Sequence, residues 1–128
     1  MRKILAGTFG TLIMAAMAAP SFAHHSTAMY DMTKTVKLTG KIKEFQYTNP
    51  HSWLLINVKQ QNGKMQTWGF EAEGPSTLMR AGIRKSDLTP GMEVTVTTHP
   101  MKNGKPAGEL MMVKRMSDGK VFNPRPKK

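Results

Sequence analysis

The stretch MQTWGFEAEGPSTLMRAG, residues 65–82, decides the fold, because it changes from a strand pattern to a helix pattern within a few residues. Its first half, Met65 to Ala72, contains a Trp and a Phe and is typical of a β-strand. A Gly-Pro-Ser turn at residues 74–76 leads into a short run that ends at Gly82. Glycine commonly ends a helix, so we expect a strand followed by a helix of about two turns.

Strand patterns lie on both sides of this stretch, and turn signals separate them. Before it, residues 36–47 and 53–58 carry alternating or β-branched apolar residues, and Asn62-Gly63 is a strong hairpin signal. After it, residues 93–98 and 109–116 have the same strand character. The sequence therefore predicts three strands, one helix and two further strands.

This element order, β-β-β-α-β-β, is the order of the OB-fold, a small five-stranded Greek-key barrel. We therefore expect an all-β domain with one short helix that forms an OB-fold-like barrel. Another small antiparallel barrel or sandwich is the alternative. The barrel domain should span residues 35–122, with an N-terminal arm at 24–34 and a disordered basic tail at 123–128.

The first 23 residues have the parts of a secretory signal peptide. A basic start precedes a mostly apolar run at residues 4–19, and Ser21-Phe22-Ala23 places small residues at positions −3 and −1 of a cleavage site. The run is shorter than the roughly 20 residues that a membrane-spanning helix needs, so we favour cleavage over an anchor. We expect a periplasmic or secreted chain that begins at His24 and does not span a membrane. Cleavage after Ala18 is the alternative.

The chain contains no cysteine, which excludes disulfides and thiolate metal sites. It has 19 basic and eight acidic residues, and two of the basic residues lie in the signal peptide. The mature chain therefore has a net charge of +9 with neutral histidines, which favours an anionic partner. The lysines are scattered, so solvated surface is the simpler interpretation. Nucleic acid is not expected as a partner outside the cytoplasm.

Distinctive motifs occur along most of the mature chain. They are Ala23-His24-His25-Ser26, Thr48-Asn49-Pro50-His51-Ser52-Trp53, Trp68-Gly69-Phe70-Glu71, Gly74-Pro75-Ser76, and Leu88-Thr89-Pro90-Gly91 before Val94-Thr95-Val96. In this combination the sequence resembles a family of small exported bacterial proteins that is classified only as a domain of unknown function. The resemblance implies an exported location and a small β-rich domain. It implies no established activity.

The four histidines are the main chemical signal in the mature chain. His24 and His25 would form its first two residues, His51 lies in the expected loop after the first strand, and His99 opens the expected loop after the fourth strand. In an OB-fold these two loops flank the ligand-binding face. We therefore expect His51 and His99 to border one cleft.

The free amine and the ring of a terminal His24 can chelate one metal ion, with His51 or His99 as a remote ligand and His25 as a substitute. This arrangement resembles the histidine brace of copper proteins. Nitrogen ligands suit Cu(II) and thioethers suit Cu(I), so copper is the expected metal and zinc is the second choice. The candidate soft ligands are Met29, Met32 and Met101. Each histidine alone also has an ordinary interpretation as a turn cap, a surface residue or a chain end.

No catalytic motif supports an enzyme, because the chain has no nucleophile elbow, zinc-protease motif, P-loop or dinucleotide fingerprint. The carboxylates Glu71 and Glu73 have no evident partner in the sequence. The alternative function is non-enzymatic binding of an anionic glycan, lipid or protein partner, with Trp53 and Trp68 on the ligand face. Packing of these two tryptophans in the core is the alternative structural interpretation.

Overall fold

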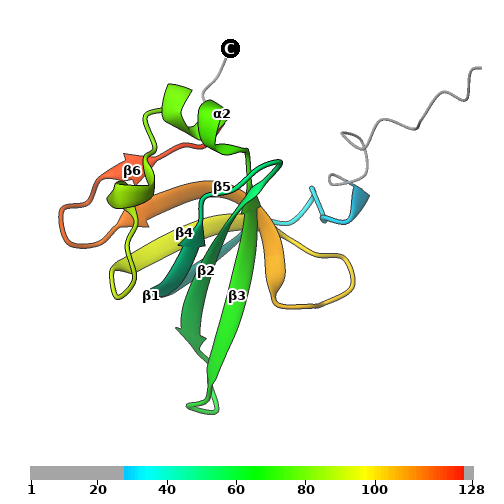
Figure 1. Cartoon of the computed structure of the whole chain (residues 1–128). Helices are drawn as coiled ribbons and strands as arrows, with labels where there is room; N and C mark the ends of the chain where they lie inside the picture. The colour runs from blue at the N-terminus through cyan, green and yellow to red at the C-terminus, as the bar shows by residue number, and fades with distance from the viewer. Residues whose placement is uncertain (1–27, 126–128) are drawn as a thin grey trace, which may run out of the picture.

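The third strand and the helix after it lie where the sequence predicts them (Figure 1). In the computed structural model, which describes residues 28–125, strand β3 is Met65–Ala72 and helix α2 is Pro75–Arg80. The other elements are β1 (Val36–Gln46), β2 (Ser52–Lys59), the 3-10 helix η2 (Lys85–Asp87), β4 (Glu93–Pro100), β5 (Ala107–Arg115) and β6 (Val121–Phe122). The predicted signal peptide, His24, His25 and residues 126–128 lie outside the described residues.

The strands form one sheet in the order β3-β2-β1-β4-β5-β6, and β3 also pairs with β5. This last pairing is parallel and joins the two ends of the five-stranded order, so that the sheet closes into a barrel. β1 is long enough to pair with two neighbours, using residues 36–41 for β4 and residues 41–46 for β2. The predicted OB-fold-like barrel, with the order β-β-β-α-β-β, is confirmed.

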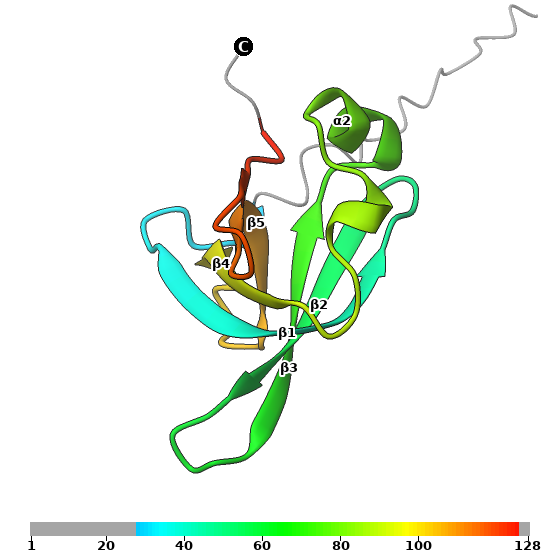
Figure 2. The same ribbon diagram turned by 90° about the vertical axis from the view of Figure 1, so that its left-hand side faces the viewer.

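Alternating side chains of the strands fill the barrel. On β2, Leu54 and Ile56 are fully buried, and they face Phe70 on β3 and Val96 on β4 within one apolar cluster. Leu78 of α2 is also fully buried and joins this cluster. In both views α2 lies at the end of the barrel opposite the projecting β2–β3 hairpin (Figures 1 and 2). The short helix therefore closes one end of the core.

Strand β4 is longer than the sequence predicts, and His99 lies within it rather than in the following loop. The reason is pairing with β5, because His99 and Pro100 are the register partners of Glu109 and Gly108. Just beyond the strand, Tyr30 forms an isolated antiparallel bridge with Met101. The amide of Asp31 donates to the carbonyl of Pro100 at 2.8 Å and the amide of Lys102 donates to that of Met29 at 2.9 Å. The predicted N-terminal arm is thus attached to the end of β4.

The segment predicted as a disordered tail begins against the barrel. Pro124 is buried, and the side chain of Arg125 contacts two carboxylates. Among residues 28–125, no helix has the length and apolar character needed to cross a membrane.

Candidate functional site

Two carboxylates lie side by side where β3 and β5 close the barrel. Glu71 and Glu109 are direct partners in the parallel register. Their chain neighbours Phe70 and Leu110 are buried in the barrel, so strand alternation turns both carboxylates to the outer face. Outer-face carboxylates are normally exposed, but Glu71 is only 8 % exposed and Glu109 only 2 % exposed. Other parts of the chain must therefore cover them.

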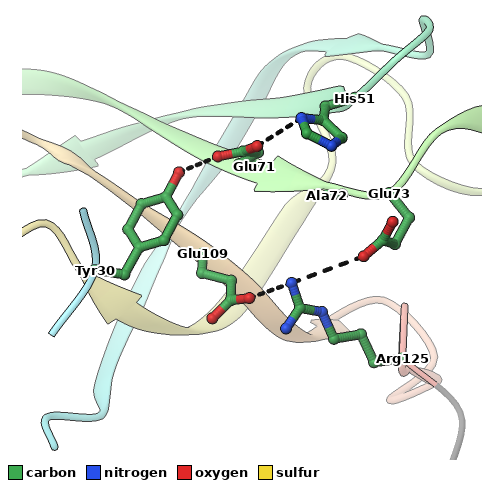
Figure 3. A pocket seen from close by; sticks show the side chains of 7 residues that line it. All are labelled: Tyr30, His51, Glu71, Ala72, Glu73, Glu109 and Arg125. Atoms are coloured by element: carbon green, nitrogen blue, oxygen red, sulfur yellow. Dashed lines mark hydrogen bonds and ion pairs between the residues drawn. The ribbon is translucent and has the colours of Figure 1, made fainter. Parts of the chain in front are cut away.

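The cover comes from the two ends of the described chain. Tyr30 donates its hydroxyl hydrogen bond to Oε2 of Glu71. Arg125 forms an ion pair with Oε1 of Glu109, and its Nη2 lies 3.8 Å from Oε1 of Glu73. Figure 3 shows Tyr30 and Arg125 approaching the carboxylates from opposite sides. Segments nearly a hundred residues apart in sequence thus meet at one site.

His51 reaches the same cluster from the loop before β2. Its Nδ1 lies 2.7 Å from Oε1 of Glu71, and the loop is held by a hydrogen bond from the Thr48 hydroxyl to the His51 carbonyl at 3.1 Å. A neutral imidazole that donates from Nδ1 has its lone pair on Nε2. The side chain is 38 % exposed, so solvent reaches part of the ring.

These side chains surround a small cavity of about 20 Å³ (Figure 3). Its lining residues are Tyr30, His51, Glu71, Ala72, Glu73, Glu109 and Arg125. The volume suffices for one water-sized occupant. Three of the chain's eight acidic residues line it, against one arginine. In a strongly basic protein this cavity is locally acidic, so it favours a cation over an anion.

Tyr30 stays a neutral hydrogen-bond donor in this environment. Its pKa is raised well above the usual phenol value, first by burial, then by its hydrogen bond to Glu71 and by the negative charges of Glu71 and Glu109. A phenolate beside these carboxylates would be strongly disfavoured. Tyr30 therefore anchors the N-terminal segment to Glu71 as a permanent donor.

The described carboxylates and histidines do not form a ready three-ligand metal site. Within residues 28–125, no group of three or more His, Asp or Glu side chains is arranged to hold a metal ion. His51 offers one nitrogen, and His24 and His25 lie outside the described residues. Any metal bound at His51 would need further ligands from residues before 28.

The structure does not bring His51 and His99 together, which corrects the expectation of a shared cleft. His51 directly precedes β2 and His99 lies on β4, two strands that do not pair with each other. His51 lines the cavity, while His99, also described, does not. Instead, Nδ1 of His99 lies 2.6 Å from the carbonyl oxygen of Lys34. His99 thus helps to hold the N-terminal segment.

The remaining predicted site residues are spread over the surface and the core. Met29 and Met32 are exposed, Met101 is the backbone partner of Tyr30, and none of these three described residues lines the cavity. Trp53 pairs with Glu71 and shares its outer face. Trp68 stacks on Phe70, with ring centroids 6.1 Å apart, and packs against the core. The two tryptophans therefore do not form a common ligand platform.

Sequence reasoning found His51 but missed most of its surroundings. It left Glu71 without a partner and did not consider Glu109, Tyr30 or Arg125. One signal was available, because the alternation in β3 that buries Phe70 turns Glu71 outward. Its contact with Glu109 follows only from the β3–β5 closure of the barrel.

A family model described as "Family of unknown function (DUF6152)" matches residues 12–110. Comparisons with curated proteins and with solved structures find no match.

Proposed function

We propose that this chain, which belongs to the Family of unknown function (DUF6152), is a small exported protein that binds one copper ion. The ion is held between Nε2 of His51 and the amine and ring of His24 at the mature N-terminus. His25 can replace the His24 ring as a ligand. Zinc is the second choice of metal, since nitrogen ligands favour copper in the affinity series.

One observation carries this proposal: Glu71 binds both the His51 ring and the Tyr30 hydroxyl. A metal-binding histidine usually donates its other ring N–H to a carboxylate, which fixes the ring and raises its basicity. His51 has this arrangement with Glu71, since its Nδ1 lies 2.7 Å from a carboxylate oxygen. The pair is therefore preorganised for a cation at Nε2.

Glu71 also holds the N-terminal segment close to His51. His24 precedes Tyr30 by six residues, and six extended residues reach about 20 Å. Because Tyr30 and His51 contact the same carboxylate, a terminal amine at His24 can reach His51. His99 is the less favoured remote ligand, since it lies on β4, which does not pair with β2.

The alternative, an anionic ligand on the outer face of β2 and β3, is weaker. Trp53 is half-buried on that face, but its register partner is Glu71. An anion there would meet the three carboxylates of the cavity. Polyanion binding would have to use the scattered lysines instead.

Copper titration of the mature protein tests the proposal, with Cu(II) EPR and d–d absorption as readouts. We expect one tight, nitrogen-rich site. An extra N-terminal residue, which removes the amine chelate, and His51→Ala should each weaken binding by more than about tenfold, and Glu71→Gln should weaken it by roughly 10- to 100-fold. His99→Ala is the comparison and should weaken binding less than His51→Ala, because His99 contacts only the Lys34 carbonyl of the N-terminal segment. Unchanged binding after both the extension and His51→Ala would contradict the proposal.

Cleavage before His24 is a requirement that can be measured separately. Intact-mass analysis of the exported protein under non-denaturing conditions reads the first residue and any bound metal together. A mature chain that begins at Ala19 would separate the amine from the histidines and remove this chelate.

A further inference from the structure

The cavity beside His51 contains an unusual carboxylate that the copper proposal does not use. Glu109 is 2 % exposed, and its Oε2 is buried with no hydrogen-bond partner among the residues that the structure describes. A buried ionised oxygen without a partner is costly. This atom therefore indicates an occupant of the cavity that carries a positive charge or donates a hydrogen bond.

The neighbours of Glu109 favour a cation. Glu71 is its register partner on β3, and Glu73 is bridged to it by Arg125. Like charges placed this close repel each other unless a positive charge lies between them. The guanidinium of Arg125 supplies one positive charge against three carboxylates. The cavity volume of about 20 Å³ leaves room for one small ion.

Arg125 is well suited to leave. It lies three residues after Phe122, the last residue of β6, and its side chain is 43 % exposed while Glu109 is buried. Its contact with Glu73 is long, at 3.8 Å. This partly exposed guanidinium can be displaced without opening the barrel.

We propose that this cavity is a second cation site, with oxygen ligands from Glu109 and Glu73, and that Arg125 acts as its tethered counter-ion when no metal is bound. Glu71 completes the negative wall while it holds Tyr30 and His51. Carboxylate oxygens select hard divalent ions such as Mn²⁺ or Ca²⁺. The site is distinct from the nitrogen-rich copper site in both ligands and metal class.

Mn²⁺ binding, followed by the loss of the EPR signal of free Mn²⁺, tests this inference. The protein is the mature chain with one extra N-terminal residue, so that the proposed His24 chelate is disabled and the two proposals fail independently. We expect weak binding by this chain and at least tenfold tighter binding by Arg125→Gln. Arg80→Gln, which removes the same charge from the exposed helix α2, is the control and should leave binding unchanged. Ca²⁺ should compete with Mn²⁺.

A second comparison identifies the ligand. Adding Glu109→Gln to Arg125→Gln should abolish the gain in Mn²⁺ affinity, and Arg125→Lys should bind Mn²⁺ less tightly than Arg125→Gln because it keeps a cation. Saturating Mn²⁺ should raise the melting temperature of Arg125→Gln more than that of Arg80→Gln, because a ligand stabilises the state that binds it. If the occupant is instead a water or a proton on Glu109, Arg125→Gln will bind Mn²⁺ no better than Arg80→Gln. That result, or a gain that survives Glu109→Gln, overturns the inference.

Discussion

At the scale of single residues, Glu71 is the side chain on which most contacts of the candidate site depend. One of its oxygens accepts from Tyr30 and the other lies 2.7 Å from Nδ1 of His51. Both of its oxygens are therefore used, one to attach the N-terminal segment and one to orient a ring. The positioning of His51 and the attachment of Tyr30 depend on the same carboxylate.

Alkaline pH should reveal the environment of the tyrosines. The chain has two, Tyr30 and Tyr47, and burial raises the pKa of both above the usual value of 10.0. A raised phenol pKa stabilises the fold fully below pH 10, and this contribution is lost as the pH rises toward the folded-state pKa, because the unfolded chain releases its protons first. Native protein should therefore show little phenolate absorbance at 295 nm near pH 10, whereas the chain in urea titrates there.

The variant Tyr30→Phe assigns the more shifted group. It should remove the phenolate signal that appears at the highest pH and leave that of Tyr47, whose hydroxyl donates to the carbonyl of Ile83 at 2.7 Å. A phenolate signal near pH 10 that Tyr30→Phe removes would show that Tyr30 is not covered as described.

At the scale of elements, the sequence correctly predicted the strands, turns and helix that are determined by interactions between residues close together in the chain. The Asn62-Gly63 hairpin, the bounds of β3 and the helix after Gly74 agree with the structure because turn chemistry and side-chain alternation act over a few residues. The extension of β4 past Thr98 was missed, since it depends on the register of His99 and Pro100 with Glu109 and Gly108 of β5, which no local turn signal indicates.

The difference between local and long-range interactions also explains which residues of the candidate site were predicted from the sequence. His51 was found because Asn-Pro-His is a local loop motif, but its environment is not local. Tyr30 and Glu71 are 41 residues apart, and Arg125 lies in a segment whose composition indicates disorder. Neither end of the chain has a periodicity from which its packing against the barrel can be predicted.

Helix α2 offers a test of the element scale, because two adjacent residues differ in burial. Leu78 is fully buried at the end of the barrel, whereas Met79 is 60 % exposed. Leu78→Ala should lower the free energy of unfolding by about 2–5 kcal/mol through lost burial and a cavity. Met79→Ala should change it by less than about 0.5 kcal/mol. Urea denaturation measures both, and similar losses for the two variants would mean that α2 does not close the core.

At the scale of the whole molecule, the closure of the barrel gathers acidic residues in one cavity, although the chain as a whole is basic. The mature chain has an expected net charge of +9, yet three of its acidic residues line one cavity beneath Tyr30 and Arg125. A cation is therefore attracted to this cavity although the surface as a whole repels it. Long-range repulsion of this kind is screened by salt, whereas contacts in a partly buried site are screened much less.

Salt dependence should consequently distinguish the two proposed kinds of binding in one preparation. On immobilised heparin, the mature protein should elute below about 0.15 M NaCl, where the screening length is about 8 Å, because its lysines are scattered and offer no dense anion site. Copper affinity at constant pH should stay level or rise slightly over the same salt range, because chelation depends on contact and added salt only weakens the repulsion from the basic surface. Retention on heparin well above 0.15 M NaCl, together with copper binding that does not depend on His51, would favour the anionic-ligand alternative. The matched variant Glu73→Gln should leave heparin retention nearly unchanged, since Glu73 belongs to the acidic cavity and the polyanion would contact the lysines.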